Sequence, residues 1–193
     1  MARILGLILA GGQGSRMGGA DKALLFLAGQ SLLAHVIRRF APQVPALAIS
    51  ANGDAERFAV FGLPVLADQA SGQGPLAGVL AGLDWAADQG SAALVTVAVD
   101  TPFFPDDLVA RLTVFPGGAM AADAAGLHPT FGLWPVAARP TLAQALQAGE
   151  RRLAAFADSH GFARVTFPGS DRFFNINRPA DLLRAEALCE AGA

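Results

Sequence analysis

Two cations accompany a glycine-rich turn near the start of the chain. The segment from Leu9 to Leu25 reads LAGGQGSRMGGADKALL and contains Arg16 and Lys22; its five glycines are Gly11, Gly12, Gly14, Gly18 and Gly19. Backbone N–H groups of glycine approach an anion without interference from a Cβ atom, and the two cations add charge-assisted hydrogen bonds. These residue types predict a binding site for a polyphosphate.

The turn fits neither of the two best-known phosphate-binding patterns. The Walker pattern requires Gly-Lys followed by Ser or Thr, whereas Lys22 stands between Asp21 and Ala23. A dinucleotide fingerprint requires a glycine where Met17 stands, and an acidic residue at the end of the second strand, where Asn52 stands. An ordinary tight connection is the alternative interpretation, and the two spaced cations favour the phosphate site.

Two carboxylates end apolar runs farther along the chain. Asp100 follows the run of residues 93–99 directly. A carboxylate there suits Mg²⁺, which takes one or two carboxylates together with substrate phosphates and water. Capping of the helix that we expect Pro105 to open is the alternative role. Asp68 ends the run of residues 64–67 and either binds a ligand or caps the loop that follows.

The elements that position these groups alternate between strand-like apolar runs and segments of helical period. Such alternation is typical of an α/β domain with a mostly parallel sheet covered on both faces. The predicted strands are residues 4–10, 46–51, 64–67, 93–99, 119–122, 130–134 and 163–167. The predicted helices start near Ser31, Asp54, Leu76, Pro105, Pro140, Arg151 and Pro179. Because ligands collect at the carboxyl ends of parallel strands, we expect the glycine turn, Asn52, Asp68 and Asp100 at one edge of the sheet.

Composition narrows the classes of partner. The chain has 193 residues, 14 basic and 16 acidic, and its formal charge of −2 offers no general attraction for nucleic acid or anionic lipid. The single cysteine, Cys189, excludes an intrachain disulfide and fits a reduced compartment. No apolar stretch approaches the roughly 20 residues that cross a bilayer. We expect one cytoplasmic domain over residues 1–193 that binds a small molecule, with no nucleic acid and no membrane.

The order of motifs resembles the molybdenum cofactor guanylyltransferases, the MobA family of small nucleotidyltransferases. The matching segments are Leu9-Ala10-Gly11-Gly12, Ser15-Arg16-Met17-Gly18, Asp21-Lys22-Ala23-Leu24, Asp68, Gly74-Pro75-Leu76-Ala77-Gly78, Asp100-Thr101-Pro102, His128-Pro129-Thr130, Gly149-Glu150-Arg151-Arg152 and Asn175-Ile176-Asn177-Arg178-Pro179. The resemblance implies a Rossmann-like three-layer domain of the nucleotide-diphospho-sugar transferase type. It also implies transfer of GMP from GTP to the phosphate of molybdenum-molybdopterin, release of pyrophosphate and a requirement for Mg²⁺.

The same resemblance implies roles for individual residues. The catalytic set is Arg16, Lys22 and Asp100, and Asp100 also binds the metal. By this resemblance, the residues that contact GTP are Leu9, Ala10, Gly11, Lys22, Asp68 and Asp100. The glycine turn itself adds Gly12 and Gly14 to the predicted GTP site. Family members often end the second strand with Asn-x-Asn, whereas this chain has Ser50-Ala51-Asn52. The nucleotide contact of the first Asn therefore falls to Ser50 or to Asn52.

The C-terminal third is expected to bind the acceptor. Arg151 and Arg152 are candidates for the pterin phosphate, and solvation at a helix start is their alternative role. Asn175 and Asn177 lie on an extended segment, where we expect their side chains to point to opposite faces, so that only one faces the ligand. We interpret His128 as a loop hydrogen-bonding residue, and His35 and His160 as helix-surface residues. Handover of the product implies transient contacts with cofactor biosynthesis proteins and with molybdoenzymes or their chaperones.

Two rival functions remain. A related nucleotidyltransferase would use CTP with molybdopterin, or a sugar or polyol phosphate acceptor; the Gly11-Gly12 pair and Asp21-Lys22 favour the guanylyl branch. A non-catalytic nucleotide or cofactor carrier ranks lower, because Arg16, Lys22 and Asp100 are all present.

Overall fold

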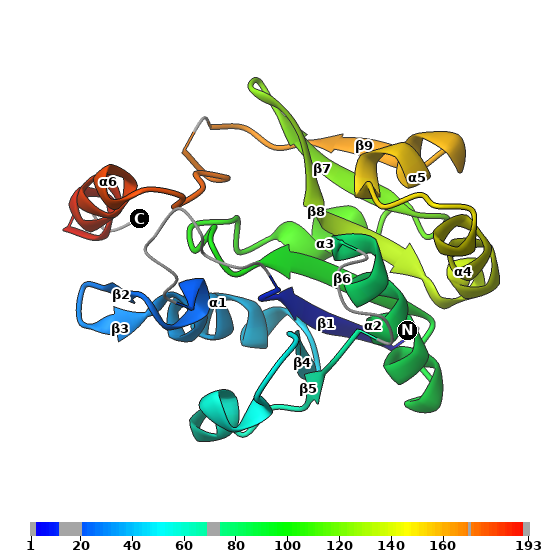
Figure 1. Cartoon of the computed structure of the whole chain (residues 1–193). Coiled ribbons are helices and arrows are strands. Elements are labelled where there is room, and N and C mark those ends of the chain that lie inside the picture. Colours follow the sequence, from blue (N-terminus) through cyan, green and yellow to red (C-terminus); the bar gives the residue numbers. More distant parts are fainter. Residues whose placement is uncertain (1–2, 12–20, 69–73, 170, 191–193) are drawn as a thin grey trace.

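A seven-stranded sheet forms the centre of the molecule, for which the computed structural model describes residues 3–11, 21–68, 74–169 and 171–190. The strand order is β5-β4-β1-β6-β8-β7-β9 (Figure 1). The strands are β1 (Ile4–Leu9), β4 (Leu47–Ser50), β5 (Val65–Leu66), β6 (Ala93–Ala98), β7 (Ala119–Asp123), β8 (Gly126–Pro135) and β9 (Ala163–Thr166). Only β8 runs antiparallel to its neighbours in this sheet, β6 and β7. The predicted α/β fold with a mostly parallel sheet is confirmed.

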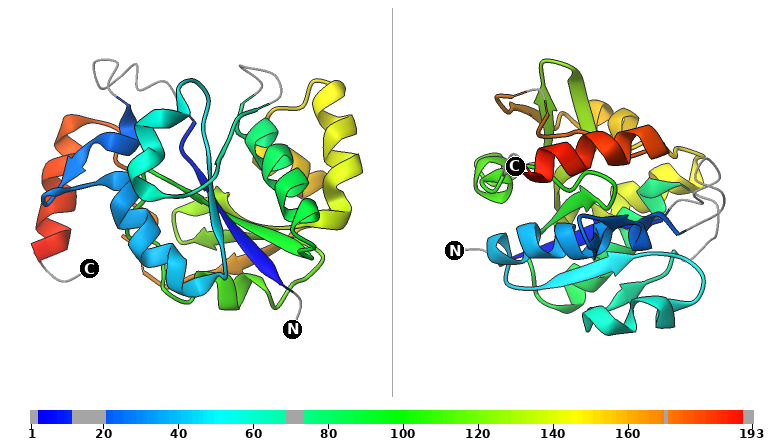
Figure 2. Two further views of the ribbon diagram at one scale, coloured as in Figure 1. Left: turned by 90° about the horizontal axis from the view of Figure 1, so that it is seen from below. Right: turned by 90° about the vertical axis from the view of Figure 1, so that its left-hand side faces the viewer.

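Helices cover both faces of this sheet and complete a three-layer arrangement (Figures 1 and 2). They are α1 (Leu32–Phe40), α2 (Pro75–Asp88), α3 (Leu108–Leu112), α4 (Arg139–Gln147), α5 (Leu153–Ser159) and α6 (Pro179–Glu190). Short 3₁₀ turns are η2 (Lys22–Leu24), η3 (Ala41–Gln43), η4 (Ala55–Phe61) and η5 (Val136–Ala138). Apolar residues of α1 and α3 share one core cluster, whereas those of α2, α4 and α5 share the other. No helix in the described part of the chain is both long and apolar enough to span a membrane.

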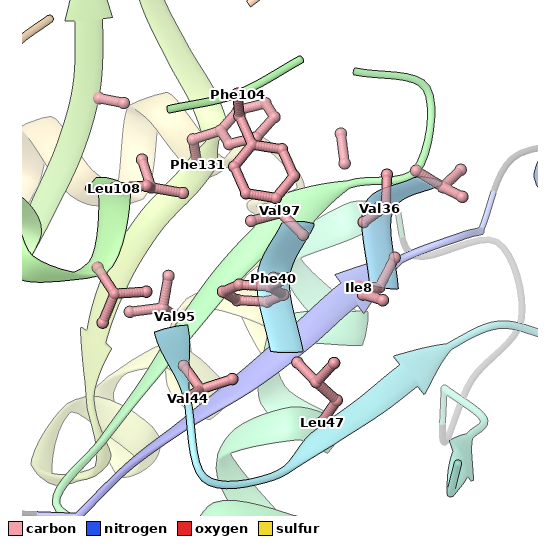
Figure 3. Close-up of a cluster of buried hydrophobic side chains, with 14 of the residues drawn as sticks. Ile8, Val36, Phe40, Val44, Leu47, Val95, Val97, Phe104, Leu108 and Phe131 are labelled. Carbon is pink, nitrogen blue, oxygen red and sulfur yellow. The ribbon is translucent and has the colours of Figure 1, made fainter. Parts of the chain in front are cut away.

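Strand β1 shows how the sequence builds both clusters. Its leucines Leu5 and Leu7 belong to the cluster under α2, and Ile8 belongs to the cluster under α1, because successive side chains of a strand point to opposite faces. Gly6 leaves room for α1: a Cβ atom there would come within 2.7 Å of the Phe40 ring. Figure 3 shows Phe40 within this cluster of buried side chains, which also includes Ile8 and Leu47. The sheet and α1 therefore pack closely at Gly6.

Local signals in the sequence set several helix boundaries correctly. Helix α1 begins after Ser31, whose Oγ accepts a hydrogen bond from the Ala34 N–H at 3.2 Å. Helix α6 begins at Pro179, where the Asp181 carboxylate accepts hydrogen bonds from two preceding backbone N–H groups. The helix expected from Pro105 is different, because residues 105–107 form a turn and α3 starts only at Leu108.

A short hairpin and two histidines differ from the sequence-based interpretation. Strands β2 (Phe26–Leu27) and β3 (Gln30–Ser31) pair across Ala28 and Gly29, which both have positive φ. Two-residue strands carry no detectable period, and alanine is an unusual residue for such a turn. His35 is buried rather than on a helix surface, because its Nε2 bonds the Leu27 carbonyl of this hairpin at 2.7 Å. His128 lies within β8 rather than in a loop, with its Nε2 2.9 Å from the Asp123 carboxylate.

Candidate active site

Strands β1, β4, β5 and β6 all end at one edge of the sheet, its carboxyl edge. These four strands are parallel and lie side by side in the spatial order β5-β4-β1-β6, each hydrogen-bonded to the next. The edge is the upper one in the left view of Figure 2, where β1 and β4 end close together. Asn52, Asp68 and Asp100 all follow the ends of their strands here. The edge predicted for ligand binding is therefore the one at which the candidate residues gather.

Lys22 joins two segments that are far apart in the sequence. Its Nζ lies 2.6 Å from Asp100 Oδ2 and donates a second hydrogen bond of 2.6 Å to Asn177 Oδ1. The side chains of Lys22 and Asp100 are 17% and 22% exposed, so the ion pair is partly shielded from water yet remains accessible. Thr101 Oγ1 donates to the other Asp100 oxygen at 3.2 Å. The carboxylate is thus held in one orientation at the end of β6.

The segment before α6 docks on the same loop. The N–H of Ile176 donates to the Asp100 carbonyl at 2.8 Å, and the Ile176 side chain is fully buried. The side chain of Asn175 bonds Thr101 in this loop, and that of Asn177 bonds Lys22, the ion-pair partner of Asp100. The expectation that they point to opposite faces was wrong, since residues two apart on an extended segment share a face. Both asparagines therefore contact residues of the Lys22–Asp100 cluster.

A second pair of polar groups lines the edge at β4 and β5. The Asn52 side-chain amide donates to Asp68 Oδ2, and its oxygen accepts from the Asp68 backbone N–H, both at 2.9 Å. Ser50 is only 4% exposed and lies under α2, where a Cβ atom on Gly78 would collide with its hydroxyl. Asn52 is exposed. Of the two residues considered for the nucleotide contact, Asn52 is therefore the accessible one.

The other residues predicted to contact GTP around the first loop are only partly described. Leu9 and Ala10 are buried, and their backbone groups already bond neighbouring strands: Ala10 N–H donates to the Ser50 carbonyl at 2.9 Å. Gly11 is exposed, and apart from its chain neighbours no atom of the described residues comes within 4 Å of the position where a Cβ would lie. Gly12, Gly14 and Arg16 lie outside the described residues. Their roles stay predictions.

Arg57 is a member of the site that the sequence analysis missed. Its Nε lies 2.6 Å from Asp21 Oδ2, next to Lys22, and its Nη2 donates to the Asn52 carbonyl at 2.8 Å. Nothing in the local sequence marks this arginine, because it lies in a short 3₁₀ turn 36 residues beyond its carboxylate partner.

Arg151 and Arg152 form no contact with the cluster of Lys22, Asp100 and Asn177 among the described hydrogen bonds and ion pairs. They border a groove of about 610 Å³ between the end of α4 and α5. Arg151 Nη1 donates to the carbonyls of Leu146 and Glu150, and Arg152 has a side chain that is 81% exposed. Backbone hydrogen bonds from Arg152 and then Arg151 lower the pKa of Glu150. The Arg151 backbone also lies beside Gly74, the residue that precedes α2, which links the groove to the carboxyl edge.

The residue types at the edge restrict which metal would fit. Among the residues that the structure describes, no three His, Cys, Asp or Glu side chains converge to hold an ion. Asp100 therefore belongs to no such group of three. This suits Mg²⁺, which takes its remaining ligands from substrate phosphates and water, and it does not suit a structural zinc site.

Similarity to known proteins agrees with this geometry. The chain is 56% identical over 193 residues to a molybdenum cofactor guanylyltransferase of Cereibacter sphaeroides, covering 99% of this chain and 100% of that one. It is 50% identical to a protein of the same name from Mesorhizobium japonicum, covering 97% of each.

Solved structures share the fold. A molybdopterin-guanine dinucleotide biosynthesis protein A from Archaeoglobus fulgidus has a TM-score of 0.76 at 24% identity, covering 97% of this chain and 99% of that one. A 2-C-methyl-D-erythritol 4-phosphate cytidylyltransferase from Thermus thermophilus has a TM-score of 0.71 at 22% identity, covering 95% and 98%. The protein-family model described as the MobA-like NTP transferase domain matches residues 6–163 of this chain. With that match, and with relatives half identical over nearly its whole length, this chain belongs to the MobA-like family of nucleotidyltransferases.

Proposed function

We propose that this protein transfers GMP from GTP to the phosphate of molybdenum-molybdopterin and releases pyrophosphate. The observation that carries the proposal is the Lys22–Asp100 pair, with 2.6 Å between Nζ and Oδ2, at the carboxyl edge of the sheet. One partner comes from the glycine-rich segment and the other from the end of β6. The relatives named for this reaction support the choice of substrates.

The reaction does not require the protein to supply a strong general base. The acceptor phosphate is already an anionic nucleophile, and one of its oxygens attacks the α-phosphorus of GTP while the bond from that phosphorus to the β-phosphate oxygen breaks. Pyrophosphate leaves with the electron pair. The protein must bring two negative groups together and stabilise the charge of an in-line displacement. The ammonium group of Lys22, held 2.6 Å from both Asp100 and Asn177, supplies a fixed positive charge for that purpose.

Asp100 is the residue that would hold Mg²⁺. When bound, Mg²⁺ neutralises phosphate charge and polarises the oxygens of the reacting group. Lys22, together with Arg16, holds the phosphates that leave, and Asn52 and Asp68 contact the nucleotide. Asn175 and Asn177 lie on the acceptor side, and Arg151 and Arg152 in the groove beside Gly74 offer charge to the pterin phosphate.

A transfer assay tests this proposal. Purified molybdenum-molybdopterin is incubated with Mg²⁺ and with GTP, CTP or ATP in parallel, and pyrophosphate release and the dinucleotide product are measured. GTP should be the preferred donor. A preference for CTP would instead indicate the cytidylyl reaction, and binding of GTP without its consumption would indicate a carrier.

A variant of Asp100 tests the site itself. We expect Asp100→Asn to lower kcat by about 10²–10³, the loss typical when one electrostatic group of a transition state is removed. The matched control is Asp84→Asn, because Asp84 forms an ion pair of 3.2 Å with Arg139 on the surface where α2 meets α4. The control should keep full activity. Wild-type turnover by a folded Asp100→Asn variant would contradict the role of this carboxylate.

A further inference from the structure

Arg57 satisfies three acceptors that come from two separate segments. Its guanidinium donates to Asp21 Oδ2 at 2.6 Å, to the Asn52 carbonyl at 2.8 Å and to the Asp54 carbonyl. The guanidinium carbon also lies 4.3 Å from the centre of the Phe58 ring, and Phe58 is fully buried. Arg57 is therefore held in one orientation by packing as well as by hydrogen bonds.

The carboxylate that Arg57 holds is itself fully engaged. Asp21 Oδ1 accepts a hydrogen bond from the Ala23 N–H at 3.0 Å, which caps the 3₁₀ turn η2, while Oδ2 faces Arg57. The side chains of Arg57 and Asp21 are 24% and 26% exposed. Lys22 is the first residue of that turn. The position of the Lys22 backbone thus depends on a carboxylate that is anchored from another element.

On its other side, Arg57 reaches the nucleotide-binding edge. It holds the Asn52 carbonyl, and the Asn52 side chain is paired twice with Asp68. Polar contacts therefore connect Asp68, Asn52, Arg57 and Asp21. Lys22 follows Asp21 directly in the chain and pairs with Asp100. In this path, Arg57 is the residue that connects the nucleotide edge to the lysine.

We propose that Arg57 is a positioning residue, which places Lys22 for the phosphates of GTP by holding Asp21 and the turn after β4 together. This inference rests on the proposed function, because it assigns Lys22 to GTP. An exposed ion pair alone would contribute little. The planar guanidinium differs, because it serves several acceptors at once in fixed directions, which a lysine ammonium on a flexible stem does not reproduce.

Variants of both partners test the inference. We expect Arg57→Ala and Asp21→Asn each to raise the dissociation constant and KM for GTP by about 10- to 100-fold, the range for losing a hydrogen bond to a charged group. The KM for molybdenum-molybdopterin should stay unchanged. Arg57→Lys should recover less than half of the loss on a logarithmic scale. The double variant should be no worse than Arg57→Ala alone, because both changes break one connection.

The control and the contrary results are equally specific. Arg139→Ala removes a surface ion pair of similar kind, to Asp84, and should leave both KM values unchanged. Additive losses in the double variant, equal rises in both KM values or full recovery with lysine would each overturn the positioning role. So would GTP dissociation constants at the wild-type value. The dissociation constant of GTP can be measured without turnover. A wild-type protein that binds GTP but transfers no GMP would therefore refute the proposed function, and the dissociation constants of the variants would still test the role of Arg57.

Discussion

A methyl group added at Gly78 should test how closely α2 packs on the nucleotide edge. Gly78 lies in the first turns of α2, and its missing side chain leaves space for the buried Ser50 hydroxyl. A Cβ atom at this position would collide with Ser50 Oγ, whereas its distances to Asp68 Oδ1 and Leu9 Cδ2 would be an ordinary 3.4 and 3.5 Å. The Ser50 hydroxyl is thus the main obstacle to Gly78→Ala.

The magnitude follows from two opposing effects. Overpacking a buried site costs about 1–3 kcal/mol, and replacing glycine by alanine within a helix gains about 1 kcal/mol. We expect Gly78→Ala to lower the free energy of unfolding by about 1 kcal/mol, which lowers Tm by about 2–4 °C for a chain of this size. With Ser50→Ala present, the collision is gone and the helix gain remains. The same Gly78→Ala change should then raise Tm.

Thermal unfolding of four proteins measures this reversal: the wild type, the two single variants and the double variant. The matched control is Gly82→Ala, one turn farther along α2, where a Cβ would come within 2.6 Å of methyl groups of Leu7 and Leu94. Ser50→Ala should not relieve that destabilisation, since the obstacle there is different. If Gly78→Ala changes Tm by the same amount with serine and with alanine at position 50, the packing argument is refuted.

Three further predictions concern ligand binding, turnover and pH. Ser50→Ala should leave the dissociation constant of GTP unchanged, whereas Asn52→Ala should raise it, because only Asn52 is exposed and paired with Asp68. Isothermal titration calorimetry measures both constants. A rise with Ser50→Ala and none with Asn52→Ala would assign the nucleotide contact to Ser50. Lys22→Met should lower kcat/KM for GTP by about 10²–10³, and an unchanged kcat/KM in steady-state kinetics would contradict a role for the lysine. Burial, the largest single effect on the Asp123 carboxyl, raises its pKa, but the His128 ring 2.9 Å away and hydrogen bonds from the Ala125 and Gly126 backbone N–H groups outweigh it and leave the pKa lowered. The ionised Asp123 carboxylate therefore stabilises the folded protein above the ordinary aspartate pKa of about 3.9, and this stabilisation is lost as pH falls through the lowered pKa. In urea unfolding, Asp123→Asn should destabilise the protein at pH 7 and much less at pH 3. An equal loss of stability at both pH values would contradict the lowered pKa.

The sequence indicated the strands and most helices because their signals are local. Serine at the start of α1 and proline at the start of α6 marked boundaries through backbone groups only a few residues away. Apolar runs ending at Asp68 and Asp100 placed both carboxylates at the carboxyl edge, since parallel strands end together. The sequence did not predict the hairpin of β2 and β3, because strands of two residues are too short to show an alternation of apolar and polar residues.

Contacts across long stretches of chain were decided only by the tertiary structure. Lys22 meets Asn177 over 155 residues, and Arg57 meets Asp21 over 36, with no pattern in the sequence to pair them. Burial of Ser50 likewise depends on how closely α2 approaches β4 at Gly78. The sequence by itself determined which chemical groups stand at the ends of strands, because strand ends follow from local apolar runs. Which of those groups touch depends on how the loops pack, and that is fixed by the sum of many distant contacts.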